Sequence, residues 1–488
     1  METDLRRIFL LSSVLLLLTK VCFTDQAILD PDLGWHLKTG EWILQHRTVP
    51  RTDPFSQFGL GQPWVAYSWL FELLLASVEQ IFHLPGIIGL TVALASAIFT
   101  VLFLLLRATH PQPVVVMGLL LVGLIAFSPL IRTPRPWLFS ILFFVIEFHL
   151  VQRARRMRQF GYLLWLPILF LLWANIHIQF IYGLFLLGLL LLESCSFRSR
   201  GLSFNRTWLS QTTMLMVACS LATLVTPYSW HLYETLWEII RQTGVYERVQ
   251  EMQAMSFRGP ADWAVLALTV GAAYALGQTR RKDRLLVVLF IVGLFVAYRA
   301  RRDIWFLLVP CLYILADHCT SIKPHQGGLF TPRQWFASLL IVLVVNVASG
   351  HGKYLHSNHL EAELNSHYPK GAIDFIDSHT LPGPIYNPYG WGGYLIWRLP
   401  EWRVSIDGRA NLHGDERLRR YQATWGGLPH WAEDPELVAS GLVVAPSDTP
   451  LASLLKTDPR FTEVYADQTA TVFAGKQASN TQPRGHSP

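Results

Sequence analysis

Long runs of apolar residues alternate with short polar segments from the N-terminus to about residue 349. The runs occupy 8–24, 65–82, 86–106, 113–131, 137–151, 161–193, 208–226, 261–277, 285–298, 303–317 and 333–349. A membrane-spanning helix needs about 20 predominantly apolar residues, so the pattern predicts a mostly α-helical, polytopic transmembrane bundle of about 10–12 membrane segments. The run 161–193 is long enough for two short passes, and Asn175 and His177 form a polar break in its middle.

Two of these runs leave alternatives open. The run 8–24 follows Arg6 and Arg7 and fits either a signal peptide or a first span. Lys20 and the lack of a small-residue cleavage site favour an uncleaved span. The run 65–82 fits either a span or an amphipathic helix in the membrane interface, because Glu72 and Glu79 share a helix face.

Basic segments between the runs predict the orientation of the bundle. They lie at 153–158, 198–206, 278–284 and 323–333. All four fall on one side if 161–193 is a hairpin, and an excess of Lys and Arg marks the cytoplasmic side. The turn at Asn175–His177, the loop 227–260 and everything after 349 are then extracytoplasmic.

The pattern changes after His351, where apolar runs shrink to the length of strands. Strands are expected at 384–387, 403–407, 442–447, 461–467 and 469–475, with helices at 392–399, 415–425 and 451–457. Short strands alternating with helices predict a small α/β domain. We therefore expect a bundle over 1–349 with a first external loop at 25–64, an extracytoplasmic α/β domain over 350–476, and a disordered tail over 477–488.

Composition agrees with lipid as the main solvent of the chain. Hydrophobic residues make up 51% and charged residues 15%, whereas soluble proteins average about 25% charged residues. The net charge is +6, but the arginines cluster between apolar runs instead of forming a basic stripe, which argues against a nucleic-acid partner. The five cysteines lie in or beside apolar runs, so no disulfide framework is expected.

Candidate chemistry follows directly after the first apolar run, at Asp30-Pro31-Asp32. Pro31 disfavours a helical conformation for Asp30, which predicts a turn that presents both carboxylates. Asp32 then either caps a helix over 33–45 or acts as a general base, and the pair is also suited to a divalent cation. Asp53, in R-T-D-P-F-S, is a third acid on the same loop, with a turn before proline as its alternative role.

These residues carry a resemblance to a known superfamily. The segment D-P-D-L-G-W-H-L-K-T-G-E-W-I-L-Q-H-R resembles the first external loop of GT-C glycosyltransferases, especially the Asp-Pro stretch of oligosaccharyltransferase catalytic subunits. Several further blocks resemble a large bacterial group of uncharacterised GT-C-like membrane proteins. They are V-P-R-T-D-P-F-S with Q-P-W-V-A-Y-S-W-L, L-W-A-N-I-H, T-P-Y-S-W, and N-P-Y-G-W-G-G-Y-L-I-W with S-I-D-G-R.

The resemblance implies transfer of a sugar from a polyprenyl-phosphate carrier to an envelope glycan, lipid or protein at the extracytoplasmic face of the bacterial inner membrane. It assigns the base or metal-binding role to Asp32 or Asp30, with Mg²⁺ or Mn²⁺ as the possible cation. We expect Asp32 to be chemically required and Asp30 to support it.

The C-terminal motifs resemble the acceptor motif of oligosaccharyltransferases and its downstream aspartate. They place Trp391, Tyr394, Asp407 and Arg409 in acceptor binding. Glycines stand where that motif has its acidic residue, so peptide recognition is not carried over.

Further polar residues fit an anionic lipid donor. Arg132 and Arg135 flank a proline-rich turn, and Arg301 and Arg302 follow the end of a span. Guanidinium groups bind phosphate bidentately, although interfacial arginines also extend to the membrane surface without a ligand. Asn175 and His177 either join this site or form a hydrogen-bonded helix break.

Two other functions compete with the glycosyltransferase. A non-catalytic protein of the same fold would bind a glycolipid or hold an envelope complex together, and would tolerate loss of Asp30 and Asp32. A transporter is disfavoured, because the sequence shows no inverted repeat and no paired broken helices in its two halves.

Overall fold

The computed structural model describes residues 2–195, 206–242, 244, 249–279, 283–319, 330–379 and 381–476. The expected tail at 477–488, most of the basic segments 198–206 and 323–333, and residues 280–282 lie outside these ranges. The chain divides into two compact units. The helical unit covers Met1–Ala27, Pro85–Leu232 and Tyr246–His356, and the mixed unit covers Ile28–Leu84, Tyr233–Val245 and Ser357–Pro488.

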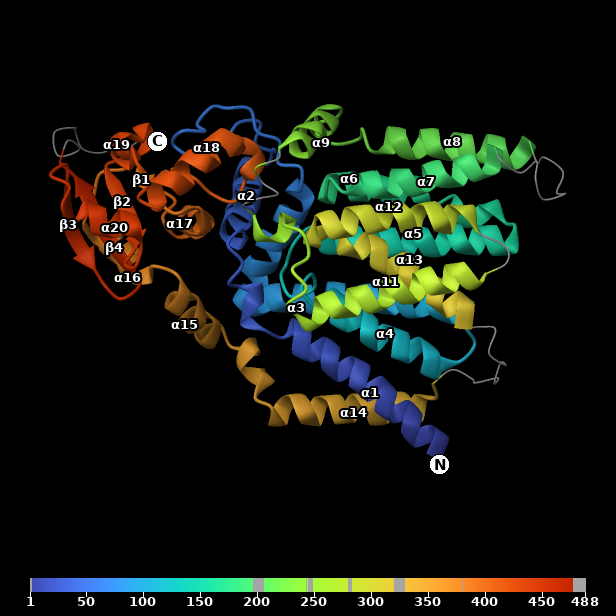
Figure 1. Ribbon diagram of the computed structural model, residues 1–488. Coiled ribbons are helices and arrows are strands. Elements are labelled where there is room, and N and C mark those ends of the chain that lie inside the picture. Colours follow the sequence, from blue (N-terminus) through green and yellow to red (C-terminus); the bar gives the residue numbers. More distant parts are fainter. Residues whose placement is uncertain are drawn as a thin grey trace. The chain divides into compact units, whose positions relative to one another are not determined.

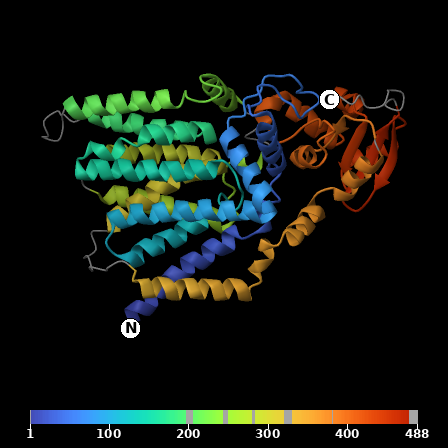
Figure 2. The same ribbon diagram turned by 180° about the vertical axis from the view of Figure 1, so that it is seen from behind.

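The helical unit is a bundle whose helices follow the apolar runs of the sequence. Its helices are α1 (Glu2–Cys22), the later part of α3 (Trp69–Thr109), α4 (Pro113–Phe127), α5 (Trp137–Met157), α6 (Leu166–Ile176), α7 (Phe180–Cys195), α8 (Arg206–Ala222), α11 (Pro260–Gln278), α12 (Arg284–Arg299), α13 (Ile304–Cys319) and α14 (Pro332–Ala348). Helices α11 and α12 both pack along α13, and all three run nearly parallel in Figures 1 and 2. Among the described residues, three helices are long and apolar enough to cross a membrane: α3, α5 and α11.

The first apolar run is an integral part of this bundle. Helix α1 lies beside α14 in Figures 1 and 2. The Gln334 side-chain amide donates a hydrogen bond to Asp4 over 2.6 Å, and the Asn346 amide donates one to Thr19 over 3.2 Å. These bonds join the two helices near both of their ends.

The ambiguous run 65–82 forms the first part of α3. The helix kinks at His83, which has a φ of 55° and a ψ of −157°. The chain passes from the mixed unit to the helical unit at this kink, between Leu84 and Pro85.

The mixed unit contains a four-stranded sheet with the order β1-β2-β4-β3. Its strands are β1 (Ile385–Tyr386), β2 (Leu442–Pro446), β3 (Phe461–Ala466) and β4 (Ala470–Gly475). Strand β1 is parallel to β2, and the other two pairings are antiparallel. The predicted mostly helical fold with a small C-terminal sheet is therefore confirmed.

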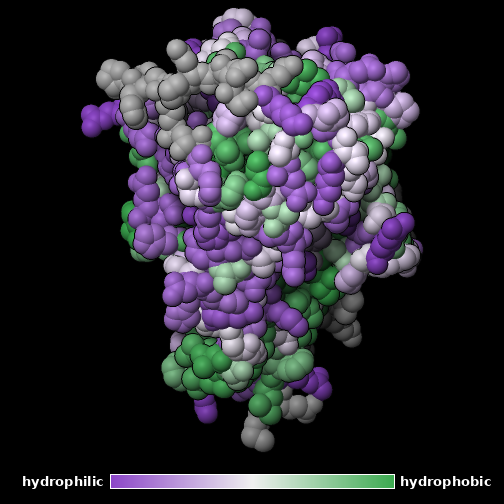
Figure 3. Space-filling view, turned by 90° about the vertical axis from the view of Figure 1, so that its left-hand side faces the viewer, coloured by the Kyte–Doolittle hydropathy of each residue, from purple (hydrophilic) through white to green (hydrophobic). Residues whose placement is uncertain are grey.

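The mixed unit also contains helices from both the N-terminal and the C-terminal part of the chain. They are α2 (Leu33–His46), α9 (His231–Arg241, which begins in the helical unit), α15 (Ser357–His367), α16 (Lys370–His379), α17 (Gly392–Arg398), α18 (Ala410–Trp425), α19 (Pro435–Val438) and α20 (Pro450–Leu455). The side of the mixed unit that faces the viewer in Figure 3 is predominantly hydrophilic, with hydrophobic side chains scattered over it.

The segment 403–407, expected as a strand, makes only isolated bridges. Val404 pairs with Ser56 on one side and with Ile385 on the other. This segment therefore connects the loop around Asp53 to the sheet. The predicted domain boundary at 349/350 placed residues 28–84 with the bundle. In the structure these residues pack with the C-terminal residues in the mixed unit.

Candidate active site

The two carboxylates of the Asp-Pro-Asp turn have different surroundings at the start of α2. The buried Asp30 side chain accepts a hydrogen bond from the Asp32 backbone N–H at 2.9 Å, and the Asp30 carbonyl accepts one from Leu33 N–H at 3.0 Å. Asp32 occupies the N-cap position, but its side chain makes no capping hydrogen bond. Asp30 thus fixes the turn, and the half-buried Asp32 carboxylate is not used as a cap.

The Asp32 carboxylate lies against Gly408. A Cβ atom at position 408 would overlap Asp32 Oδ1, and it would stand 3.1 Å from Nε1 of Trp35. The indole N–H of Trp35 is buried and has no hydrogen-bond partner among the described residues. The glycine of the I-D-G-R motif therefore provides the space for the carboxylate proposed from sequence.

Glycines also bring α2 and α17 into backbone contact. A Cβ atom at Gly34 would overlap the carbonyl of Gly393, and one at Gly393 would overlap the carbonyl of Pro31. Gly392 is likewise packed against the carbonyl of Ile406. The glycines that replace the acidic residue of the acceptor motif thus allow close packing of the Asp-Pro-Asp turn.

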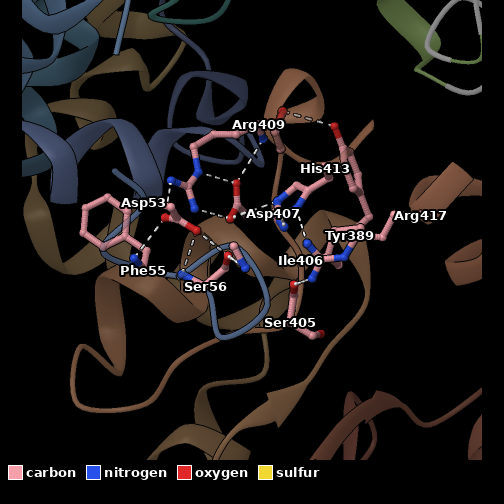
Figure 4. A network of polar contacts seen from close by, with 12 residues as sticks. Asp53, Phe55, Ser56, Tyr389, Ser405, Ile406, Asp407, Arg409, His413 and Arg417 are labelled. Carbon is pink, nitrogen blue, oxygen red and sulfur yellow. Dashed lines mark hydrogen bonds and ion pairs between the residues drawn. The ribbon is translucent and has the colours of Figure 1, made fainter. Parts of the chain in front are cut away.

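A buried ionic cluster lies in the loops beside this contact (Figure 4). The Arg409 guanidinium donates to Asp53 Oδ1 at 2.7 Å and to both oxygens of Asp407 at 2.7 Å each. It also lies 4.6 Å from the ring centroid of Trp64 and 5.3 Å from that of Phe55. One cation thus joins the loop that holds Asp53 to the segment that holds Asp407, and Arg409 lies 356 positions further along the chain than Asp53.

Asp53 is saturated by its neighbours in this cluster. Besides Arg409, it accepts hydrogen bonds from the backbone N–H groups of Phe55 and Ser56, at 3.0 and 3.3 Å, and a short one from the Ser56 hydroxyl. The structure therefore places Asp53, Asp407 and Arg409 together, with each carboxylate committed to the same guanidinium.

His413 completes the cluster on the far side of Asp407. Its Nε2 lies 3.4 Å from Asp407 Oδ2, and Nη1 of Arg417 lies 2.9 Å from its Nδ1. Burial lowers the pKa of His413 and outweighs the opposing charge of Asp407. Burial alone would raise the pKa of Asp407, but the charges of Arg409 and His413 lower it overall.

A second buried pair, His36 and Glu72, was not expected from the sequence. His36 Nδ1 lies 3.2 Å from Glu72 Oε1, with both side chains at most 4% exposed. His36 follows Asp32 by one helical turn, and its N–H donates to the Asp32 carbonyl at 3.1 Å. The sequence does show Glu72 within an apolar run, which is unusual for a carboxylate. We interpreted Glu72 as part of the polar face of an amphipathic helix.

The two aromatic residues expected in acceptor binding differ in exposure. Tyr394 is buried and stacks on Tyr368 with ring centroids 4.4 Å apart. Burial raises the pKa of Tyr394 to about 12, so its phenol stays neutral. Trp391 is half-buried at the start of α17.

The expected donor-phosphate arginines belong to the helical unit. Arg135 and Arg302 share the carboxylate of Glu251, at 3.9 and 3.7 Å. Arg301 pairs with Asp262 at 3.3 Å, and Arg132 is exposed. Glu251 is a further residue that the sequence reading did not single out.

Asn175 and His177 mark the end of α6, where the predicted polar break lies. The Asn175 amide donates to the carbonyls of Leu171 and Val225 at 2.8 and 2.9 Å. His177 Nδ1 lies 2.8 Å from the Ser140 hydroxyl, which also accepts from Trp173. These bonds fit the hydrogen-bonded helix break, and they leave a role in donor binding untested.

The described residues hold no group of three or more His, Cys, Asp or Glu side chains arranged to bind a metal ion. Asp30 and Asp32 carry two carboxylates, and one oxygen of Asp30 is engaged by the backbone. A divalent cation at this turn remains a prediction.

The fold resembles that of a solved oligosaccharyltransferase, and three described helices are long and apolar enough to cross a membrane. The chain resembles the solved structure of the Archaeoglobus fulgidus oligosaccharyltransferase in its apo form, with a TM-score of 0.51 and 11% sequence identity. The match covers 90% of this chain and 69% of that one. No family model and no curated protein matches the sequence. The expected relationship to oligosaccharyltransferases is thereby confirmed at the level of the fold.

Proposed function

We propose that this protein is a membrane glycosyltransferase that transfers a sugar from a polyprenyl-phosphate-linked donor to an envelope acceptor at the extracytoplasmic face. The observation that carries the proposal is the position of Asp32. Its carboxylate is not used for capping and lies against Gly408, on a turn fixed by Asp30. An oligosaccharyltransferase-like fold provides the context for this chemistry.

Asp32 acts as the general base that accepts the proton of the acceptor nucleophile. A base needs a defined position, and three features supply it: the Asp30 turn, the glycine contact between α2 and α17, and the buried Arg409 cluster next to Gly408. General-base assistance contributes typically 10²–10⁴-fold in rate. Asp53, Asp407 and Arg409 support the site by fixing its loops.

The donor's phosphate binds to arginines of the helical unit, with Arg135 and Arg302 as the principal pair. Charge-assisted hydrogen bonds from guanidinium to phosphate are among the strongest in proteins. If Mg²⁺ or Mn²⁺ takes part, Asp32 and Asp30 are its protein ligands, and donor oxygens complete its coordination.

A non-catalytic glycolipid-binding protein of the same fold is the second candidate. The observation in its favour is that the charged groups of Asp53, Asp407 and Arg409 bind one another. A purely structural role explains this arrangement as well. The two candidates differ in whether Asp32 is needed for turnover.

The decisive experiment compares the parent protein with Asp32→Asn in transfer of sugar from a lipid-linked donor. Because the Asp32 side chain makes no capping bond, the variant should keep its melting temperature. We expect its rate to fall by roughly 10²–10⁴-fold, as for loss of a general base. Donor candidates come from mass spectrometry of lipid-linked sugars in a deletion strain.

Asp30→Asn is the matched control. Its amide oxygen can still accept the bond from the Asp32 N–H, so the turn should remain, and most of the activity should remain where no cation takes part. Activity of Asp32→Asn within a few-fold of the parent protein would reject Asp32 as the base and favour the non-catalytic candidate.

A further inference from the structure

Two arginines of the helical unit share one carboxylate, that of Glu251. Arg135 Nη2 lies 3.9 Å from one Glu251 oxygen, and Arg302 Nη1 lies 3.7 Å from the other. The neighbouring Arg301 has its own partner in Asp262, and Asp303 accepts from Gln179 at 2.6 Å. Glu251 thus bridges the two guanidiniums with one carboxylate.

Arg302 and Glu251 lie in short 3-10 helices, and Arg135 lies just before α5. Arg135 precedes α5, and its backbone carbonyl accepts a hydrogen bond from the N–H of Leu138 at 3.1 Å, while Arg302 lies in the 3-10 helix Arg301–Asp303 that leads into α13. Both arginines therefore lie at the start of a long helix, where the helix dipole favours a negative charge. Glu251 lies in the 3-10 helix Gln250–Met252, which is held by a bond from Arg301 N–H to the carbonyl of Gln253 at 3.0 Å.

The Glu251 contacts are the longest of the arginine–carboxylate contacts among the described residues, ahead of Arg420–Asp434 at 3.6 Å. Arg155 binds Glu193 at 2.7 Å, and Arg409 binds Asp53 at 2.7 Å. Charge-assisted N–H···O bonds are typically about 2.7–2.9 Å long. At 3.7 and 3.9 Å, charge attraction holds the Glu251 carboxylate without directed hydrogen bonds.

We propose that the Glu251 carboxylate is an internal stand-in for the phosphate of the donor. It occupies the space between Arg135 and Arg302, and a phosphate displaces it on binding. This inference rests on the proposed function, because it takes the two arginines as the donor-phosphate pair. A phosphate offers more oxygens than a carboxylate and can hydrogen-bond both guanidiniums at once.

If the Glu251 carboxylate takes the place of the phosphate, removing it should strengthen phosphate binding instead of weakening it. If Glu251 occupies the arginine pair most of the time, the apparent affinity for phosphate is reduced by the fraction of molecules in which the pair is open. An open fraction of about 0.1–0.2 means that removing the carboxylate tightens binding roughly five- to tenfold. A carboxylate that merely orients the arginines would have the opposite effect when removed.

The test measures binding of farnesyl phosphate to the full chain in detergent by isothermal titration calorimetry. We expect Glu251→Gln to bind about five- to tenfold more tightly than the parent protein, by the competent-fraction argument. Arg302→Gln should bind more weakly. The double variant Glu251→Gln/Arg302→Gln should show little of this gain in affinity. Removing the competing Glu251 carboxylate helps only where the arginine pair that binds the phosphate is intact.

Asp317→Asn is the matched control for net charge. Asp317 pairs with Arg156 at 3.0 Å near the opposite end of α13, so its loss should leave the affinity unchanged. Inorganic phosphate should show the same relative gain as farnesyl phosphate at lower affinity. Farnesol, which lacks the phosphate, should show no gain, and an anionic phospholipid reports whether any lipid phosphate suffices.

Unchanged or weaker binding by Glu251→Gln overturns the stand-in, as does an equal gain in Asp317→Asn or with farnesol. Absence of farnesyl phosphate binding in all variants overturns it too. Failure of the proposed function has a different signature: the gain in Glu251→Gln persists, but the parent protein transfers no sugar.

Discussion

Arg409 is surrounded by groups that compensate the free-energy cost of burying its charge. Its guanidinium is 1% exposed, and two carboxylates accept its hydrogen bonds while Trp64 and Phe55 cover its faces. Removing one partner of a buried ion pair is strongly destabilising, because it leaves an uncompensated charge. The Asp53–Arg409–Asp407 cluster is therefore a costly set of contacts to break, and it stabilises the mixed unit.

The protonation of this cluster predicts a loss of stability in acid. The pKa of His413 is lowered in the folded state by burial, so the unfolded chain binds more protons once the pH falls below about 6.5. The pKa of Asp407 is also lowered, so its stabilising contribution is present above about 3.9, its unfolded value, and is lost below it. Both effects weaken the mixed unit as the pH decreases.

We therefore expect the melting temperature of the mixed unit to fall between pH 7.5 and pH 5, measured by differential scanning fluorimetry in detergent. His413→Gln cannot be protonated, so this part of the pH dependence should flatten in that variant. An identical slope in both proteins would assign the pH dependence to other groups.

Gly408 gives a prediction in which stability and activity separate. A Cβ atom there would overlap the side-chain atoms Oδ1 and Cγ of Asp32, but no backbone atom. Gly408→Ala should thus rotate the carboxylate away at little cost in stability and reduce transfer by roughly tenfold or more, part of the general-base contribution.

Gly390→Ala is the corresponding control, because a Cβ at Gly390 meets nothing within 4 Å. It should melt and turn over like the parent protein. Full activity of Gly408→Ala would show that the observed position of Asp32 is not the one that matters for transfer.

Among the elements, the contact between α2 and α17 depends on backbone atoms that cannot move aside. Gly34 and Gly393 face each other, and a Cβ on either would overlap a carbonyl. We expect Gly393→Ala to destabilise the protein by about 1–3 kcal/mol, as overpacking does.

Thermal unfolding measures this loss, with Gly118→Ala as the comparison. Gly118 in α4 meets nothing within 4 Å, so alanine there should be neutral or stabilising by up to about 1 kcal/mol through helix propensity. A Gly393→Ala variant as stable as Gly118→Ala would mean that α17 can shift without cost.

The sequence predicted elements better than it predicted their contacts. Apolar runs and strand-length segments located most helices and all four strands, because burial acts on the local pattern. The strand predicted at 403–407 is wrong, because Val404 makes only isolated bridges, one to Ser56 and one to Ile385. Local pattern cannot reveal such partners.

The same limit applies to the candidate site. Motifs identified Asp30, Asp32, Asp53, Asp407 and Arg409 individually, but not that Arg409 binds Asp53. His36–Glu72 and Glu251 were missed because each needs a partner that is remote in sequence. A single sequence carries no record of such pairs.

At the scale of the whole molecule, the division into units follows these remote contacts. The predicted boundary at 349/350 assumed that an external loop belongs to the bundle that precedes it. Residues 28–84 instead join the C-terminal residues, through the glycine contact and the Arg409 cluster. Asp32, the proposed base, and Arg135 and Arg302, the proposed phosphate ligands, consequently belong to different units.

The bond between Asp53 and Arg409 also sets an order of events during synthesis. Its two residues are 356 positions apart, and a ribosome adds roughly 5–20 residues per second. Asp32 and Asp53 therefore wait on the order of tens of seconds, through insertion of the helices between them, before Asp407 and Arg409 are made. A nascent chain therefore cannot form the Asp53–Arg409 bond, nor the contact of Asp32 with Gly408, until the C-terminal part of the mixed unit is translated.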